Sequence, residues 1–332
     1  PVPPIRSRYP EDGLVQKEFV NNSYKMSNSI NVLNYNEKIQ PYSGEKIAVS
    51  YGGGIDSTAL YALFPESVFV HEQTKLPNGT IIKDDSIKNI QFFNKQKKRS
   101  ISFYNTNKRG VSNPSGWATW TACVANCILI SSEYNLGYVF VGTVLASSFL
   151  GGGIKYFNTD IKKNIWIETF NKIGLNLVQV TGGLSEICNA KIIIENNLAD
   201  IPVWCNKDNG NNCHKCFKCF RRDTIFHYLE YKNYNDSYWE RYNTKEVKTF
   251  LYKKPLYGAN IFKETLKNLS HINFIKGVID EIPETKNFMT KLHLPSLKLI
   301  PLELIDMVKK RINNYIEDGD EKSLYDIKKW KV

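Results

Sequence analysis

The sequence predicts a mixed α/β fold in which a parallel five-stranded sheet carries helices on both faces. Short β-branched or aromatic runs alternate with helix-like segments five times over about 150 residues, as in strands joined by crossover helices. Hydrophobic residues make up 42% and charged residues 23% of the chain, a composition that is typical of globular proteins. A glycine-rich turn follows the first expected strand, where such sheets bind ligands.

Each expected strand is short and rich in β-branched or aromatic residues, and each expected helix has apolar residues three or four positions apart. The expected strands are residues 46–50, 67–71, 100–104, 138–141 and 175–180. The expected helices of the same region are residues 57–64, 83–98, 117–134, 160–173 and 185–197. Because parallel strands end at one edge of a sheet, the turns that follow them meet there.

Three regions are expected along the chain. Residues 1–45 are rich in Pro, Asn, Ser and Tyr without periodicity and are interpreted as an N-terminal extension. Residues 46–232 form the α/β domain, and residues 233–332 form a helical C-terminal region. The helices expected in this last region are residues 244–252, 261–269 and 301–318. No apolar run approaches about 18 residues and no apolar signal segment opens the chain, so neither a membrane helix nor secretion is expected.

The charge and cysteine content bound the function further. With 44 Lys and Arg against 33 Asp and Glu, the net charge is +11, which suits polyanionic partners such as nucleotides or nucleic acid. The excess is spread along the chain, however, which favours a solvated surface. Seven cysteines without a secretion signal indicate a reducing, cytoplasmic environment instead of a disulfide framework. Cys123 and Cys127, four apart on an expected helix, are interpreted as small core residues.

The first expected strand runs into a loop that is built for a close ligand approach. Three consecutive glycines, residues 52–54, allow a sharp turn, and Ser57 and Thr58 are placed to cap the following helix. A helix N-terminus in this position offers free N–H groups to a phosphate. The loop is neither a Walker loop, because no Lys precedes Ser57, nor a dinucleotide fingerprint, because the glycine spacing differs. The alternative is a tight strand-to-helix turn without a ligand.

Four cysteines lie within fifteen residues and predict a metal site. Cys205, Cys213, Cys216 and Cys219 have the short spacings of a closed, tetrahedral, structural zinc site. An iron–sulfur cluster and redox-active thiols are the alternatives. His214 is expected to be a solvent-side residue and not a ligand.

The loop and the cysteines together resemble a known family. Gly-Gly-x-Asp-Ser, here within residues 52–57, resembles the loop of the ATP pyrophosphatase (PP-loop) superfamily, which cleaves ATP between its α- and β-phosphates. The family usually begins this loop with a serine, which is Gly52 here. The cysteine spacing, the following Arg221-Arg222 and the Thr-Gly-Gly turn before the cysteines are similar to the 7-cyano-7-deazaguanine synthase family. The resemblance covers about residues 46–230 and implies an adenine nucleotide alpha hydrolase-like fold.

The resemblance also implies roles for particular residues. Asp56 and Ser57 are the expected catalytic residues, and Asp56 is expected to position the loop or to help hold Mg²⁺. Zn²⁺ is expected at the four cysteines. The expected ATP-binding residues are Ser50, Gly52, Gly53, Gly54, Asp56, Ser57, Thr58, His71 and Lys191. Lys155, Lys191 and Arg222 are candidates to neutralise phosphate charge, and His71 with Glu72 to contact adenine or ribose. Each of these has a plain alternative as a solvated charge or a strand-end polar residue.

The activity implied by the resemblance is ATP-dependent activation of a carboxylate, with ammonia as the nitrogen donor and 7-carboxy-7-deazaguanine or a larger acceptor as the substrate. The resembled family makes a precursor of queuosine. Its relatives also occur in bacterial antiphage operons, so a protein or a nucleic acid is an alternative acceptor. One alternative is a sulfur transferase with Cys188 as its thiol, and another is a nucleotide-binding partner module with degenerate catalysis. Aromatic and Lys residues through 228–254 are expected either to contact a partner or to pack the C-terminal helices.

Overall fold

The computed structural model describes residues 43–74, 100–105, 116–151, 156–157, 165–202, 205, 212–254, 256, 258–285 and 288–331. The expected extension at 1–42, the expected helix at 83–98 and Lys155 lie outside these ranges. A parallel sheet forms the centre of the fold, with the strand order β3-β2-β1-β4-β7. The strands are β1 (Lys46–Tyr51), β2 (Val68–Thr74), β3 (Ser100–Asn105), β4 (Leu136–Val141) and β7 (Asn176–Val178). The prediction of a mixed α/β fold with a parallel sheet is confirmed.

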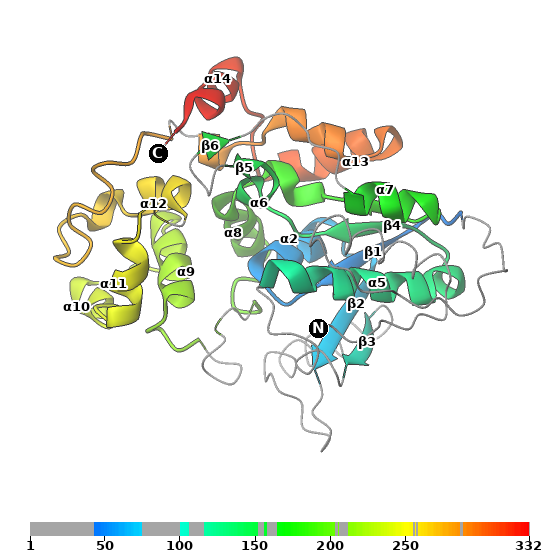
Figure 1. Ribbon diagram of the computed structural model, residues 1–332, viewed down its shortest axis with the longest axis horizontal. Helices are drawn as coiled ribbons and strands as arrows, with labels where there is room; N and C mark the ends of the chain where they lie inside the picture. Colours follow the sequence, from blue (N-terminus) through cyan, green and yellow to red (C-terminus); the bar gives the residue numbers. More distant parts are fainter. Residues whose placement is uncertain are drawn as a thin grey trace, which may run out of the picture.

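Helices cover both faces of the sheet, as the sequence predicts (Figure 1). The helices are α2 (Ile55–Leu63), α5 (Gly116–Tyr134), α7 (Ile165–Lys172) and α8 (Glu186–Glu195). Along β1, Val49 and Tyr51 pack in one core cluster with α2 and α8, while Ala48 packs in a second cluster with α5 and α7. The alternation of side chains along a strand therefore gives the sheet two buried faces.

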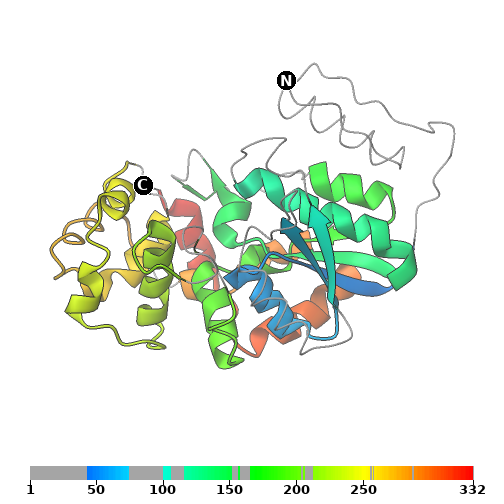
Figure 2. The same ribbon diagram turned by 90° about the horizontal axis from the view of Figure 1, so that it is seen from below.

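The chain from residue 217 onward is mostly helical: residues 217–265 lie beside the sheet, whereas residues 302–313 lie against the sheet region, where Arg311 donates to the Leu63 carbonyl oxygen at 2.7 Å (Figures 1 and 2). Its helices are α9 (Phe217–Tyr228), α10 (Asp236–Glu240), α11 (Lys245–Leu251), α12 (Ala259–Thr265), α13 (Leu302–Asn313) and α14 (Glu321–Lys329), with single 3-10 turns at η2 (Lys267–Leu269), η3 (Phe288–Thr290) and η4 (Leu294–Leu299). Helix α8 stands between α2 and α9, and so connects the sheet to this helical region.

Aromatic packing joins the cysteine region to the residues beyond 232. Phe220 of α9 contacts the rings of Trp239, Tyr242 and Phe262, and all four side chains are fully buried. The larger core cluster runs from β1 to the last helix of the chain without a break at residue 232. The domain boundary expected between residues 232 and 233 stays a prediction, because the packing shows no separation between the two regions at this position.

Several expected elements differ in their bounds. The strand expected at 67–71 continues to Thr74, so His71 lies inside it. The strand expected at 175–180 ends at Val178 and is followed by a 3-10 turn, η1 (Val180–Gly183). A Cβ on Gly182 would lie 3.2 Å from Leu299 and Ser148, so this tight turn needs a small residue where it meets neighbouring elements. The expected helix at 301–318 ends at Asn313.

Elements absent from the sequence predictions are also present. These are α6 (Leu145–Phe149), the antiparallel pair β5 (Leu150–Gly151) and β6 (Tyr156–Phe157), and helices α9, α10 and α14. The start of α9 is hard to see in the sequence because two of the four clustered cysteines, Cys216 and Cys219, occupy its N-cap and first turn. Within the described ranges, no helix combines the length and the apolar character needed to cross a membrane.

Candidate functional site

The glycine loop connects β1 to α2 and leaves the helix start open. Gly53 has φ 75°, a left-handed conformation that favours glycine. Gly54 is the N-cap, and no side chain caps the helix. The hydroxyls of Ser57 and Thr58 donate to the Gly54 carbonyl oxygen at 3.2 and 2.8 Å, so the prediction that they cap α2 is wrong. Because no described side chain caps α2, its first N–H groups are available to an external acceptor within the part of the chain that the structure describes.

The loop is packed on one side and open on another. A Cβ placed on Gly142, directly after β4, would lie 2.9 Å from the backbone of Asp56 and Ser57, so only glycine fits there. A Cβ placed on Gly52 or Gly54 would meet nothing within 4 Å. The chain runs from β1 outward to β3 and then returns past β1 to β4, so the loop lies where the strand order reverses. Ligands bind at this position in doubly wound sheets.

Asp56 extends from the first turn of α2 towards α8. Its Oδ1 accepts a hydrogen bond from Asn189 Nδ2 at 2.9 Å. Burial raises the pKa of the Asp56 carboxyl, while the Asn189 hydrogen bond and the positive charge of Arg221 lower it. Arg221 is itself paired with Glu186, its Nε donating to Oε2 at 2.7 Å and its Nη2 to Oε1. These three partners lie in the helices that flank the loop.

The strand residues expected to bind ATP have structural contacts of their own. Ser50 lies within β1 and alternates with Val49 and Tyr51, so it shares the face of the sheet that α5 covers. His71 is buried, and its Nδ1 donates to the Tyr51 carbonyl oxygen at 2.8 Å. The hydroxyl of Tyr51 is 3.1 Å from that of Thr58, which ties the end of β1 to α2. Glu72 also lies inside β2.

The basic candidates do not gather at the loop. Lys191 is about half exposed on α8 and forms an ion pair with Glu195 at 3.7 Å. Arg222 is buried, with its Nε donating to Asp223 Oδ1 at 2.6 Å and its guanidinium over the Phe226 ring. In the described part of the chain, the cation that acts on Asp56 is Arg221, which the sequence analysis used only as part of a motif.

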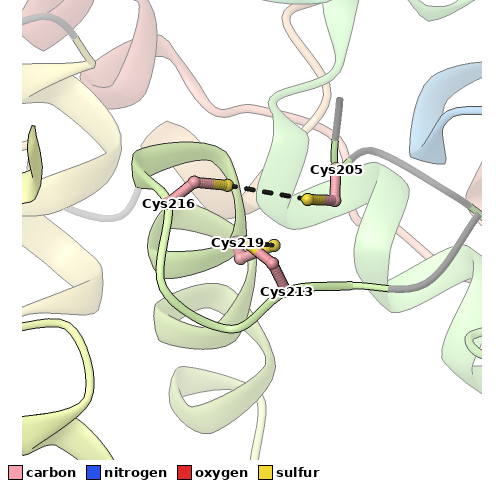
Figure 3. Close-up of side chains that lie close together, drawn as sticks. All are labelled: Cys205, Cys213, Cys216 and Cys219. Atoms are coloured by element: carbon pink, nitrogen blue, oxygen red, sulfur yellow. Dashed lines mark hydrogen bonds between the residues drawn. The ribbon is translucent and has the colours of Figure 1, made fainter. Parts of the chain in front are cut away.

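The four cysteines converge as the sequence predicts (Figure 3). Their sulfur atoms all lie within 4.8 Å of one another, with Cys205 to Cys216 and Cys213 to Cys219 both at 3.9 Å. A tetrahedron with metal–sulfur bonds of about 2.3 Å has sulfur–sulfur distances of about 3.8 Å, so the arrangement fits a zinc ion. Cys216 is the N-cap of α9.

The electrostatics of the cluster favour a cation at its centre. A hydrogen bond from Cys219 lowers the pKa of the Cys216 thiol to about 5, and the same bond raises the pKa of Cys219 far above its ordinary value. Without a cation the sulfurs thus share protons, and one thiolate forms at the expense of its neighbour. A divalent metal allows all four to ionise.

His214 is outside the sulfur cluster, as expected, and its side chain is 35% exposed, but it also belongs to a polar network behind the cluster. Its backbone has φ 48°, and its Nδ1 lies 2.9 Å from Oδ2 of the fully buried Asp223. Tyr238 donates to the same oxygen at 2.6 Å, and Tyr242 donates to it as well. Burial raises the pKa of Asp223, but these hydrogen bonds and the charge of Arg222 together hold it below its ordinary range. The network fixes the turn that carries Cys213 and Cys216.

The remaining cysteines are buried where they are described. Cys188 is 1% exposed, its Sγ contacts the Met289 carbonyl oxygen at 3.4 Å, and burial raises the pKa of its thiol. A thiol in this environment is a poor nucleophile. Cys127 is a core residue, as predicted. Cys123 lies on α5, and its side chain is outside the described part.

Sequence reasoning missed Asn189 and the Glu186–Arg221 pair. An amide among the buried residues of helix α8, between Cys188 and Ala190, was the available indication of a polar contact. Nothing in the sequence spacing pairs Glu186 with Arg221, which lie 35 positions apart.

A family model described as "Family of unknown function (DUF6395)" matches residues 165–331. The chain belongs to this family. The matched segment begins at α7 and includes α8, the four cysteines and the C-terminal helices, but not the glycine loop. No match was found among curated proteins or among solved structures.

Proposed function

We propose that the protein is an ATP-dependent adenylating enzyme that binds ATP at the glycine loop and releases pyrophosphate. The observation that carries this proposal is the N-terminus of α2, which no described side chain caps. It follows Gly52 and Gly54, beside which there is open space, and it lies where the strand order of the sheet reverses. Backbone N–H groups and the helix dipole at such a terminus stabilise phosphate oxygens. The match to Gly-Gly-x-Asp-Ser supports a pyrophosphate-binding role for residues 52–57.

In this proposal each part of the loop has a separate task. The N–H groups at the start of α2 bind the leaving pyrophosphate, and Gly53 gives the turn that exposes them. Asp56 offers a carboxylate beside the phosphates, where it helps to hold Mg²⁺ or orients the loop. Asn189 occupies Oδ1 of this carboxylate, and in this proposal Oδ2 is the oxygen that faces the ligand.

The proposed acceptor is a carboxylate, either 7-carboxy-7-deazaguanine or a larger carboxylic acid. A carboxylate oxygen attacks the α-phosphorus of ATP, the bond to the bridging oxygen breaks, and pyrophosphate leaves. Ammonia then attacks the acyl carbon, loses a proton, and expels AMP to give the amide. Adenylation of the amide oxygen by a second ATP, followed by loss of AMP and two protons, gives the nitrile. Binding contributes by alignment and by exclusion of water.

The four cysteines support a structural role for zinc in this enzyme. All four positions of a tetrahedron are taken by sulfur, which leaves no coordination site for a substrate. We propose that zinc holds the turn before α9 and thereby the packing of α9 on α8. A free-thiol, metal-binding chain also suits a reducing cytoplasm.

Two alternative functions are a sulfur transferase and a nucleotide-binding partner module. Sulfur transfer through Cys188 is disfavoured, because the thiol is buried and its pKa is raised. A nucleotide-binding partner module, for instance in antiphage defence, is favoured by one feature only: Gly52 replaces the usual loop serine. The additional chain outside the resemblance would then contact a protein partner or a larger acceptor.

The decisive test of the proposal is pyrophosphate release by the full chain. The zinc-loaded protein is incubated with ATP, Mg²⁺, ammonia and 7-carboxy-7-deazaguanine, and products are identified by mass spectrometry. We expect AMP, pyrophosphate and a product lighter than the acid. Asp56→Ala should stay folded and release no pyrophosphate, whereas binding of ATP without release in the native chain would favour the partner module.

A further inference from the structure

The carboxylate of the glycine loop is held by a residue outside the loop. Asn189 Nδ2 donates to Asp56 Oδ1 at 2.9 Å, and the Asn189 side chain is fully buried. Its neighbours on α8, Ile187, Ala190 and Ile193, are buried apolar residues. Burying an amide within a helix lowers stability unless the amide makes a needed hydrogen bond. The contact with Asp56 is such a bond.

The orientation of this amide is dictated by the carboxylate. With Nδ2 towards Asp56 the contact is attractive, whereas the flipped amide would place Oδ1 against an ionised oxygen. The Oδ1 of Asn189 is buried and has no hydrogen-bond partner among the described residues, so the Nδ2 contact alone fixes the side chain. One oxygen of Asp56 is thereby occupied by the amide.

The position of Asn189 is fixed in turn by the start of α8. Ser185 caps the helix, accepting from the N–H groups of Ile187 and Cys188 at 3.1 and 3.2 Å. The first helical residue, Glu186, is paired with Arg221, and the two side chains are 13% and 21% exposed. Arg221 lies two residues after Cys219 on α9. The charged groups that face Asp56 in the described structure are therefore Arg221 and, behind it, Glu186.

We propose that Asn189 is a positioning residue that aligns the Asp56 carboxylate of the glycine loop, and that the Glu186–Arg221 pair sets its place relative to the cysteine-bearing helix α9. The catalytic consequence rests on the proposed function, and the structural consequence rests only on the hydrogen bond. Misplacing a catalytic group by about 1 Å reduces rates by about 100-fold, which sets the scale of the expected effect.

The test compares Asn189→Leu, which keeps the branched shape in a larger side chain but removes the donor, with Asn196→Ala at the other end of α8. Asn196 Nδ2 bonds to the Ile192 carbonyl oxygen at 2.8 Å and its Oδ1 accepts from the Tyr315 hydroxyl at 3.2 Å, so it serves as a control amide that does not contact Asp56. Thermal unfolding checks that each variant is folded, and Asn189→Ser is the replacement if the Leu variant is not. The Asp56 carboxyl is followed by ¹³C NMR titration and assigned by its absence in Asp56→Asn.

We expect Asn189→Leu to raise the pKa of Asp56, because the lost hydrogen bond stabilised the ionised form. Turnover should fall about 10- to 100-fold, while KM for ATP should stay within about threefold. Arg221→Gln should raise the same pKa, and Lys232→Gln, an exposed charge beyond α9, should not.

The outcomes separate this inference from the proposed function. An unchanged Asp56 titration and turnover in Asn189→Leu, or an equal loss in Asn196→Ala, would overturn the positioning role. If the native chain releases no pyrophosphate but Asn189→Leu still shifts the Asp56 titration, the proposed function fails and the positioning role stands.

Discussion

Gly52 and Gly53 are adjacent in the loop but differ in what the backbone requires. A Cβ on Gly52 meets no atom within 4 Å, and Gly52 lies outside the left-handed region that Gly53 occupies at φ 75°. We expect Gly52→Ser to leave the fold unchanged and to restore the hydroxyl that the resembled loop contains. A hydrogen bond to a charged group contributes about 1.5 kcal/mol or more, so pyrophosphate affinity should rise roughly 10-fold.

Isothermal titration with pyrophosphate, together with thermal unfolding, measures both effects. Gly53→Ala is the control, because a side chain in the left-handed region is destabilising by about 1–2 kcal/mol. Equal unfolding temperatures for the two variants, or weaker pyrophosphate binding by Gly52→Ser, would contradict this account of the loop.

Asp56 is the residue where function and stability are expected to oppose each other. Its folded pKa is raised above the ordinary 3.8, so the folded state binds more protons than the unfolded state in the interval above 3.8. Stability therefore falls as pH rises through that interval, and Asp56→Asn removes this loss. We expect the unfolding temperature of Asp56→Asn to exceed that of the native chain by more at pH 8 than at pH 4. A difference independent of pH would show that the carboxyl is not desolvated.

At the residue scale, contacts were predictable from the sequence only where the spacing of residues along the chain determines which side chains meet. The cysteines are close in the chain and chemically alike, so their convergence follows from their spacing. Asn189 and Arg221 could not be found in this way, because their partners lie 133 and 35 positions away. The contact of His214 was missed because its partner, Asp223, lies on helix α9, which the sequence analysis did not predict.

If the four cysteines bind zinc as proposed, helix α9 is the element whose formation should depend most directly on the metal. Its N-cap is Cys216, and Cys219 lies in its first turn. We expect about one zinc per chain, and we expect Cys213→Ser to lose zinc and stability together, because metal binding is coupled to folding. Elemental analysis and thermal unfolding are the measurements.

Cys127→Ser is the matched control for this prediction. Cys127 is a buried thiol in the second core cluster, so its replacement should lower stability without changing the zinc content. Iron with visible absorption in the native chain, or full zinc in Cys213→Ser, would contradict the assignment.

The strands were predictable as elements because each is a short apolar run between polar or glycine-rich turns. Their ends were less predictable: β2 continues past His71, and β7 stops early where the chain turns into η1. Neither end is determined by local composition. Pairing of His71 with Ser102 and of Thr74 with Asn105 extends β2, and the close approach of Gly182 to Leu299 turns the chain after β7.

At the scale of the whole molecule, the residues beyond 232 complete the core around α9. Trp239, Tyr242 and Phe262 are fully buried against Phe220, and Tyr238 and Tyr242 donate to the buried Asp223. Loss of one buried aromatic side chain is destabilising by about 3–5 kcal/mol, and a domain is stable by only about 5–15 kcal/mol. We therefore expect a chain ending at Lys232 not to fold.

Cooperative thermal unfolding and zinc content test this truncation. Leu302→Ala in the full chain is the control, because this side chain is 86% exposed and its loss should change neither quantity. A truncated chain that unfolds cooperatively and retains zinc would show that residues 46–230 suffice as a folding unit.

The fold class was predictable from alternation of strands and helices, but the joining of the α/β and helical regions was not. Periodicity reports which residues are buried, not which partner buries them. In the sequence, Phe220 is an apolar residue directly after the last clustered cysteine, and its partners lie 19 to 54 positions further along the chain.

The central claim is that the glycine loop binds ATP so that its α–β phosphate bond is broken. The most direct measurement is pyrophosphate and AMP formation by the zinc-loaded full chain with ATP, Mg²⁺, ammonia and 7-carboxy-7-deazaguanine, beside Asp56→Ala. The account predicts pyrophosphate and AMP in equal amounts from the native chain and neither from the variant. ADP and phosphate as products, or equal pyrophosphate release by a folded Asp56→Ala, would contradict it.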